Sequence, residues 1–518
     1  METMSSGPGA TGEPPDDVRR LARRGSAGLA GSAVTALAQL ALTVVVARGL
    51  DKPQAGIFFT ATSLFLILST FTRLGTPTGL VWALSGQRAR GENDRLRPTI
   101  GIALPPVLIT GLVLALGLVL AAHPIAQALL SENTAPELVD RMVLILRAMA
   151  IFVPVAAIYD AVCAASRGLG VMRSTIYVER LLRPVLQCLA VAALAWYSGA
   201  LLVTLAWLVP YAFALVLAGQ MLLTVVRRTA PPGNGPAPRR EFWAFTGPRA
   251  LANLAQTIQQ RLDIVLVGAL LGPREAAIYA AATRFLVLGQ AAGLAISMAV
   301  EPSLGAALGV GDRRGAGTVY RLGTAWLVVV TWPIYLFAFV APGLVLSVFG
   351  RGYGAGAGVV RVLAAAMLVA TGCGMVDLVL MMAGRTWWNL GNVGLGVGLF
   401  VVADLILIPR QGIRGAAIGW AVAILVNNLL PLAQVGAALR LHPFGRATAV
   451  AAAWALLACG VLPAVLLLPL HGSLWQLVAV VLLALAVYGA GLFRLRRPLE
   501  LIHLPIPGHR GRALARTA

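Results

Sequence analysis

The chain has 518 residues, of which 58% are hydrophobic and only 12% charged, and its mean hydropathy is +0.83. This balance excludes an ordinary soluble domain, in which roughly a quarter of the residues are charged. The formal charge of +21 would suggest a nucleic-acid partner for a soluble protein. Here most arginines lie in short loops between apolar blocks, so we expect no nucleic acid.

The apolar blocks follow one another along the chain, and each is long enough to cross a hydrocarbon core of about 30 Å. Fourteen spans are predicted, at 26–49, 55–86, 99–122, 138–166, 175–198, 201–226, 246–270, 275–300, 317–341, 357–383, 388–408, 412–438, 447–470 and 474–494. The segments 55–86 and 138–166 exceed one crossing, so they must tilt, break or extend into water. In the first, Gly75-Thr76-Pro77 predicts a break.

Arginines concentrate in alternate loops between these spans. The rich set contains Arg19 to Arg24, Arg88 to Arg97, Arg167 and Arg173, Arg227 to Arg240, Arg313 and Arg314, Arg385, Arg440 and Arg446, and the arginines from Arg494 onward. The opposite set contains only Lys52, Arg274, Arg351, Arg410 and Arg414. Because cytoplasmic loops carry the basic excess, we predict a multi-pass protein of the cell (inner) membrane with both termini in the cytoplasm.

An internal repeat predicts the domain organisation. A shift of 221 residues places Gln54–Thr62 over Glu275–Thr283 with four identities. Two repeated lobes around a central cavity are typical of alternating-access transporters. The predicted segments are a disordered cytoplasmic tail at 1–25, an N-terminal six-helix lobe at 26–226, a cytoplasmic linker at 227–245, a C-terminal six-helix lobe at 246–438, two further spans at 447–494 and a basic cytoplasmic tail at 495–518. The fold class is therefore an all-α polytopic membrane protein with about 14 transmembrane helices, two pseudo-symmetric lobes and two C-terminal helices.

The sequence encodes no recognisable catalytic or metal chemistry. A P-loop needs a lysine, and the sole lysine, Lys52, follows no Gly-rich pattern. The five histidines lie in loops or the tail without metal-ligand spacing, and the four cysteines lie inside apolar blocks. We therefore expect neither an enzyme nor a cofactor or metal, and transport must be secondary or facilitated.

The stretch Ala403-Asp-Leu-Ile-Leu-Ile-Pro-Arg-Gln-Gly-Ile-Arg-Gly-Ala-Ala-Ile-Gly419, followed by Asn427, resembles the hallmark of polysaccharide flippases. This family belongs to the superfamily that also holds multidrug exporters and lipid II flippases. Shorter matches, such as Tyr279-x-x-Ala-x-Arg284, run over most of spans 1 to 12. The resemblance implies a two-lobe core, and the extra spans at 447–494 favour its lipid-linked saccharide branches. Asp404 departs from the hallmark, which commonly has Asn there.

Arginines inside spans are the main candidates for substrate binding, because ionisable groups in a membrane are costly and usually face a cavity or a partner. Arg284 lies near the midplane of its span, and Arg73 lies just before the predicted break. A guanidinium group suits a diphosphate, which lipid-linked saccharides carry, so we assign these two to the diphosphate. Arg261, Gln256 and Gln260 of span 7 complete the substrate-binding candidates. Gln256, Gln260 and Asp263 are spaced four and three residues apart, which predicts a polar stripe on one face of this helix.

Four aspartates are candidates for ion coupling. Asp160, Asp377 and Asp404 are single carboxylates in their spans, for which helix-to-helix hydrogen bonding competes with coupling, whereas the two roles are balanced for Asp263. Glu179 and Arg183 stand four residues apart and predict a structural ion pair at the start of span 5.

These features predict a flippase that moves a polyprenyl-diphosphate-linked oligosaccharide to the outer leaflet for cell-surface polysaccharide synthesis. The alternatives are an ion-coupled exporter of amphipathic small molecules or a lipid II flippase on the same fold, and a non-transporting scaffold of a polysaccharide assembly complex. The expected partners are the lipid-linked saccharide, membrane lipids and glycosyltransferases or a polymerase of the pathway. The identity of the sugar, the use of an ion gradient and the oligomeric state stay open.

Overall fold

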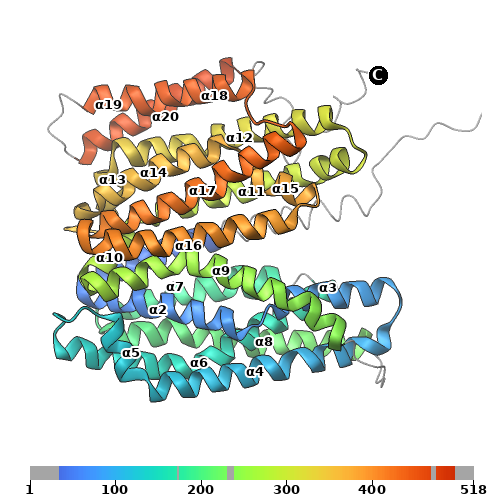
Figure 1. The fold of residues 1–518 in the computed structure, drawn as a ribbon. Helices are drawn as coiled ribbons and strands as arrows, with labels where there is room; N and C mark the ends of the chain where they lie inside the picture. The colour runs from blue at the N-terminus through green and yellow to red at the C-terminus, as the bar shows by residue number, and fades with distance from the viewer. Residues whose placement is uncertain (1–33, 172–173, 230–238, 468–473, 496–518) are drawn as a thin grey trace, which may run out of the picture.

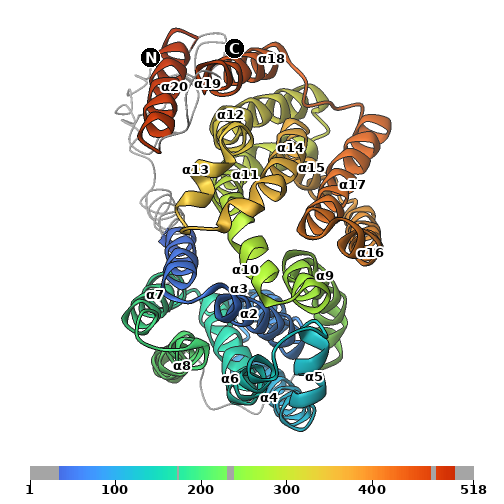
Figure 2. The same cartoon turned by 90° about the vertical axis from the view of Figure 1, so that its left-hand side faces the viewer.

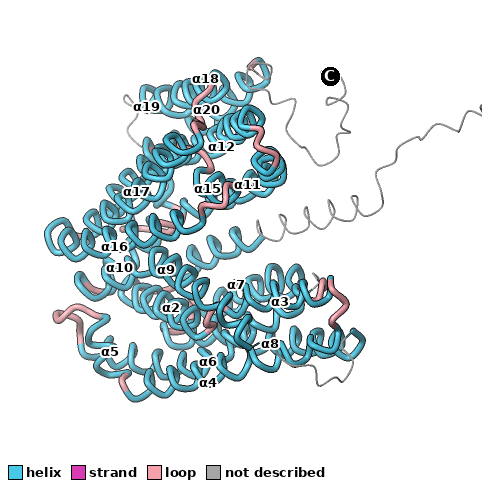
Figure 3. The backbone as a smooth tube through the Cα atoms, turned by 45° about the vertical axis from the view of Figure 1, so that its right-hand side comes forward, coloured by secondary structure: helices cyan, strands magenta, loops and turns pink. Residues whose placement is uncertain are grey.

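The computed structural model describes residues 34–171, 174–229, 239–467 and 474–495, and within these ranges the chain forms helices and short connections without any strand (Figure 3). The helices of the first half are Val34–Gly49, α2 (Lys52–Thr72), α3 (Thr76–Ala89), η1 (Asn93–Arg95), α4 (Leu96–Leu120), α5 (Ala122–Leu129), α6 (Pro136–Gly168), η2 (Ser174–Leu182), α7 (Arg183–Leu194) and α8 (Ala200–Thr229). Those of the second half are α9 (Arg239–Leu271), α10 (Pro273–Ala282), α11 (Phe285–Gly309), α12 (Arg313–Val340), α13 (Pro342–Ser347), η3 (Tyr353–Gly356), α14 (Ala357–Gly372), α15 (Val376–Met382), α16 (Thr386–Gln411) and α17 (Ile413–Leu439). The chain ends in α18 (Arg446–Ala455), η4 (Leu456–Val461), α19 (Leu462–Leu467) and α20 (Leu474–Arg494).

Every predicted span contains helix, and the all-α polytopic fold is confirmed. Among the described residues, eleven helices are long and apolar enough to cross a membrane. The other three predicted spans fall on the shorter helix Val34–Gly49, on η2 with α7, and on the more polar α9. The span predicted at 138–166 is one continuous helix, α6, of 33 residues, or about 50 Å.

The break predicted at Gly75-Thr76-Pro77 separates α2 from α3. Asp51 caps the start of α2, where its carboxylate accepts a hydrogen bond from the backbone N–H of Gln54. The helix ends where Leu74 and Gly75 take left-handed backbone angles, with φ of 51° and 72°. Pro77 then lies in the first turn of α3, where its missing N–H costs no helical hydrogen bond.

The two halves of the chain form two groups of helices that run roughly side by side (Figure 1). Seen along the helices, α2 to α8 form one group, α11 to α17 form the other, and α9 and α10 lie between them (Figure 2). Helix α2 packs against both α9 and α10. The C-terminal helices α18 to α20 pack on α12, where the Tyr488 hydroxyl donates to the Val329 carbonyl at 2.8 Å.

Glycines allow the close approach of α2 to the second half. A Cβ atom on Gly56 would lie 1.6 Å from the carbonyl oxygen of Pro273, at the start of α10. A Cβ atom on Gly268 of α9 would lie 2.7 Å from the hydroxyl of Thr60. Small residues are what membrane helices use to bring their backbones together.

Contacts join the two halves at both ends of α2. At one end, Arg48 Nε donates to the Val348 carbonyl at 2.7 Å, and the Tyr353 hydroxyl donates to the Ala47 carbonyl at 3.3 Å. At the other end, the rings of Trp82 in α3 and Phe245 in α9 stack with centroids 4.2 Å apart. The interior is therefore bounded by inter-half contacts at both ends.

The 221-residue repeat agrees with the helix starts but not with the helix breaks. Helices α2 and α10 begin at Lys52 and Pro273, which are 273 − 52 = 221 residues apart. The repeat would place the α2–α3 break at 294–296, inside α11, whereas α10 ends earlier, before Thr283 and Arg284. The pseudo-symmetry of the lobes and their boundaries stay predictions.

Three predicted segments lie largely outside the described residues. These are the tail at 1–25, the tail at 495–518 apart from Leu495, and the linker core at 230–238. Helix α8 continues to Thr229 and α9 begins at Arg239. Both ends of the predicted linker 227–245 are therefore helical.

Candidate functional site

A small cavity of about 140 Å³ lies between the two halves, and we call it the arginine pocket. Three guanidinium groups line it: Arg183 at the start of α7, Arg261 in α9, and Arg284 between α10 and α11. Apolar, hydroxyl and amide side chains from Val34–Gly49, α2, α7 and α8 complete the lining. Residues far apart in the sequence therefore converge on one point.

Local structure places each of the three guanidinium groups. Arg284 lies at the break after α10, and its Nε donates to the Ala280 carbonyl at 3.0 Å. It is eleven residues from the start of α10, or about 16 Å along the chain, close to half of a bilayer core. Arg183 lies over the rings of Tyr211 and Tyr159, with its Cζ 4.7 and 5.6 Å from their centroids.

The arginine pocket has no acidic side chain in its lining. The ion pairs within the described residues use other arginines, and the buried Nε of Arg183 has no hydrogen-bond partner there. Cation–π contact with two tyrosines offsets part of the desolvation of Arg183. The buried carboxylate of Asp263 lies outside the lining and interacts electrostatically with Arg261 and Arg284. Three guanidinium groups against one carboxylate still favour an anion in an interior of low dielectric.

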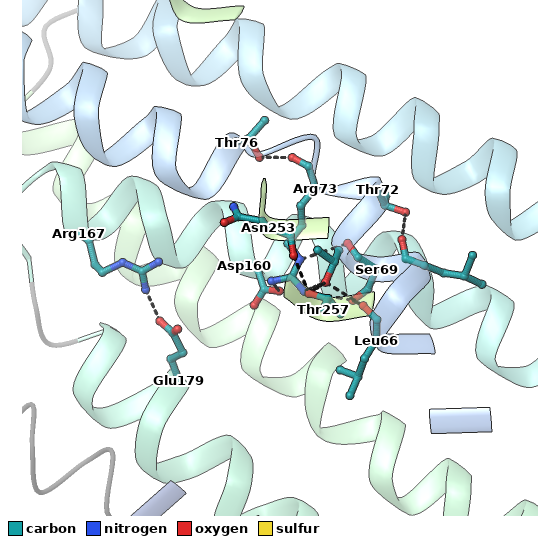
Figure 4. Close-up of polar contacts among 12 residues, drawn as sticks. Leu66, Ser69, Thr72, Arg73, Thr76, Asp160, Arg167, Glu179, Asn253 and Thr257 are labelled. Carbon is teal, nitrogen blue, oxygen red and sulfur yellow. Dashed lines mark hydrogen bonds and ion pairs between the residues drawn. The ribbon is translucent and has the colours of Figure 1, made fainter. Parts of the chain in front are cut away.

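Arg73 does not line the arginine pocket. Its Nη1 lies 3.0 Å from the Asp160 carboxylate of α6, its Nε donates to the Ser69 carbonyl and its Nη2 donates to the Thr70 hydroxyl (Figure 4). It is seven residues, or about 10 Å along the chain, beyond Leu66, the last α2 residue in the pocket lining. The structure therefore does not place Arg73 and Arg284 in one pocket, and it pairs Arg73 with Asp160. Their joint binding of a diphosphate stays a prediction.

The predicted pair of Glu179 and Arg183 is also wrong. Glu179 pairs with Arg167 at the end of α6 (Figure 4), which leaves Arg183 for the arginine pocket. The reason lies in η2, which is a π-helix and therefore has wider turns than an α-helix. Residues four apart do not face each other there as they do on an α-helix.

A second cavity, of about 600 Å³, lies within the second half. We call it the amide cavity, because six carboxamide side chains line it: Gln256, Gln259, Gln260, Gln290, Asn427 and Asn428. The substrate-binding candidates of α9 thus divide between two neighbouring cavities, with Gln256 and Gln260 in this one and Arg261 in the arginine pocket. Asp377, at the start of α15, lines the amide cavity as well.

Two of the candidate coupling residues lie together. Asp263 of α9 and Asp404 of α16 are buried, interact electrostatically with each other, and both interact with Tyr279. Neither carboxylate oxygen of Asp404 has a hydrogen-bond partner among the described residues. Gly419 of α17 packs against this carboxylate, since a Cβ atom there would lie 2.0 Å from Oδ1. No group of three or more His, Cys, Asp or Glu suited to a metal occurs in the described ranges.

The sequence pattern of the family described as polysaccharide biosynthesis protein matches residues 22–306, more than half of the chain. The chain belongs to this family. A second pattern, described as MatE, matches residues 248–395. Together with the fold, these matches identify a transporter of the flippase type, not an enzyme. No curated protein matches the chain.

Solved transporter structures share the fold at low sequence identity. The lipid II flippase MurJ in an inward closed conformation is 12% identical with a TM-score of 0.73, over 91% of this chain and 98% of that one. An inward-facing multidrug resistance MATE family transporter of the MOP superfamily is 16% identical with a TM-score of 0.62, over 78% and 94%. A MOP superfamily transporter from Pyrococcus furiosus is 17% identical with a TM-score of 0.54, over 83% and 97%.

Sequence reasoning assigned Arg183 to the wrong role and did not single out Gln259, Gln290, Asn427 or Asn428 as substrate-binding residues. The free-energy cost of placing an arginine in a membrane could have marked Arg183 as a binding residue. The four-residue spacing from Glu179 instead suggested that an ion pair with this carboxylate offsets that cost. The amides of α11 and α17 could be found only once these helices were known to line the same cavity as α9.

The pairing of Arg73 with Asp160 predicts a role in stability. Arg73→Leu should lower the free energy of unfolding by about 3–5 kcal/mol, because it leaves the partly buried Asp160 carboxylate without its counter-charge. The double variant Arg73→Leu/Asp160→Leu should recover most of the loss. The melting temperature in detergent measures the stability of the single and the double variant. Removal of the exposed Arg90–Glu92 pair is the control and should change the melting temperature little. A double variant that melts no higher than Arg73→Leu would contradict the pairing.

Proposed function

We propose that this protein moves a polyprenyl-diphosphate-linked oligosaccharide across the membrane by alternating access, for cell-surface polysaccharide synthesis. The observation that carries the proposal is the arginine pocket, with three guanidinium groups and no carboxylate in its lining. Guanidinium groups donate paired hydrogen bonds to phosphate oxygens and stay charged at any physiological pH. Membership of the polysaccharide biosynthesis family supports a saccharide-bearing cargo.

The direction of transport follows from the orientation that we propose. Both termini and the loop at 227–241 are cytoplasmic because these segments hold dense arginine clusters. The substrate then enters from the cytoplasmic leaflet of the cell membrane and leaves at the outer leaflet. Labelling of a cysteine at position 234 by an impermeant reagent in intact cells would contradict this orientation.

The alternatives fit the site less well. An exporter of amphipathic cations needs acidic walls, which Glu301 and Asp377 give the amide cavity, but the arginine pocket repels a cation. A lipid II flippase carries the same diphosphate, so the family match and not the pocket favours a polysaccharide precursor. A scaffold without transport has no use for polar cavities in the interior of a membrane protein.

The proposal predicts that Arg284→Gln stops export without unfolding the protein. Loss of one charge-assisted contact costs about 1.5–3 kcal/mol, so substrate binding should weaken roughly ten- to a hundredfold. The lipid-linked intermediate should accumulate in cells, while the melting temperature in detergent stays near that of the wild type. Arg361→Gln is the matched control, because Arg361 of α14 is exposed and lines neither cavity. Normal export by Arg284→Gln would remove this residue from the substrate site.

We also propose that transport is coupled to a cation or a proton at Asp263 and Asp404. Asp263 is compensated electrostatically by Arg261 and Arg284, but the buried Asp404 carboxylate is repelled by Asp263 and has no hydrogen-bond partner among the described residues, so a cation or proton would stabilise it. An inward sodium or proton gradient should stimulate export by the wild type in proteoliposomes. Asp404→Asn should lose most of this stimulation, whereas Asp94→Asn, at an exposed position in η1, should keep it. Equal stimulation of Asp404→Asn and the wild type would refute the coupling site.

A further inference from the structure

The amide cavity is a polar chamber built by helices of a membrane protein. Gln256, Gln260 and Gln290 are exposed, although they occupy the middle of α9 and the first half of α11. Amides at such positions avoid lipid and face a wet interior. The volume, about 600 Å³, lies in the usual range of small-molecule sites, roughly 300–1,000 Å³, whereas the arginine pocket is much smaller.

The hydrogen-bonding groups of the amide cavity match the hydroxyl groups of a sugar. Each carboxamide offers donors and an acceptor, as each sugar hydroxyl does. Part of this capacity is unused among the described residues: Tyr335 is fully buried and lines the cavity, and its hydroxyl has no partner. Asn427 donates to Gln259 at 3.3 Å, but its own buried Oδ1 accepts no hydrogen bond. Unpaired buried polar atoms are costly until a ligand or water satisfies them.

The amide cavity also differs from the arginine pocket in charge. Its carboxylate lining residues are Glu301 of α11 and Asp377 of α15, and its lining contains neither arginine nor lysine. Both carboxylates belong to exposed residues and have no ion-pair partner among the described residues. A bound group that carried its own carboxylate would be repelled here.

The two cavities are close enough for a single substrate to occupy both. Gln260 and Arg261 are consecutive in α9, so this helix presents one side chain to each cavity. On α11, Gln290 follows Arg284 by six residues, or about 9 Å along the chain. In such a substrate the sugar is bonded directly to the diphosphate, so the two groups would lie in adjacent cavities.

We propose that the amide cavity binds the saccharide of the lipid-linked substrate, and that Glu301 and Asp377 select a neutral or amino-bearing sugar over a uronic acid. This inference rests on the proposed function, in which the arginine pocket holds the diphosphate. It defines the substrate class by charge: an anionic linkage joined to a sugar without negative charge.

The test compares four ligands on the purified full-length protein by native mass spectrometry. All share one short-chain polyprenyl diphosphate, which is either free of sugar or bears an N-acetylhexosamine, a 2-amino hexose or a hexuronic acid. The first two sugars should tighten binding roughly tenfold or more relative to the bare carrier, and the uronic acid should not. Gln290→Leu should remove the gain and leave the affinity for the bare carrier unchanged. Gln220→Leu, at an exposed position of α8, is the matched control.

The charge selection has its own variant. In Glu301→Gln/Asp377→Asn, the uronic acid should bind as tightly as the neutral sugar. Two results would overturn the proposed saccharide site and leave the proposed diphosphate site intact. One is equal affinity of the wild type for the ligands with neutral and acidic sugars. The other is a loss of affinity in Gln290→Leu that is as large for the bare carrier as for the ligands with sugar. A different result would overturn both this inference and the proposed function. In it, the bare carrier does not bind at all, the lipophilic cation ethidium binds tightly, and Asp377→Asn weakens the binding of ethidium.

Discussion

Three guanidinium groups that share one buried cavity, with the single carboxylate of Asp263 interacting with two of them, set the main physical constraint on this structure. An arginine near the middle of a bilayer costs at least about 2.5–3.5 kcal/mol on insertion scales. Arg183, Arg261 and Arg284 share one small cavity, so mutual repulsion adds to this cost. Tyrosine rings and backbone carbonyls offset part of it for Arg183 and Arg284. The part of this free-energy cost that is not offset favours the binding of an anion, and a diphosphate would supply the negative charge.

Helix α9 carries one of these arginines and packs against both halves of the molecule. It packs against α2 and α3 of the first half and against α10, α16 and α17 of the second. Along its length it supplies amides to the amide cavity, Arg261 to the arginine pocket and Asp263 to the carboxylate pair. A change in the charge at Asp263 therefore acts on the helix that also lines both cavities. This arrangement gives a physical route by which an ion could alter the position of α9 against α2.

The sequence was sufficient for features that depend on local pattern, and insufficient for those that depend on packing. Hydropathy and the Gly75-Pro77 signal predicted the helical segments and the break after α2, because both arise from the chain's own backbone preferences. The cost of buried charge singled out Arg284 and Arg261, which line the arginine pocket. The partner of Arg73 could not be predicted, because Asp160 is brought to it only by the packing of α6 against α2. Arg183 was misassigned because the π-helical turns of η2 alter the spacing rule on which its predicted pair relied.

The central claim is that the interior recognises an anionic diphosphate and not a cation. The most direct measurement compares two ligands with the same short polyprenyl chain, one ending in a diphosphate and the other in a quaternary ammonium group. The account predicts that the purified protein binds the diphosphate at least about tenfold more tightly, with the difference shrinking as salt screens the guanidinium charges. Tighter binding of the ammonium ligand, or equal binding of the two, would contradict the account.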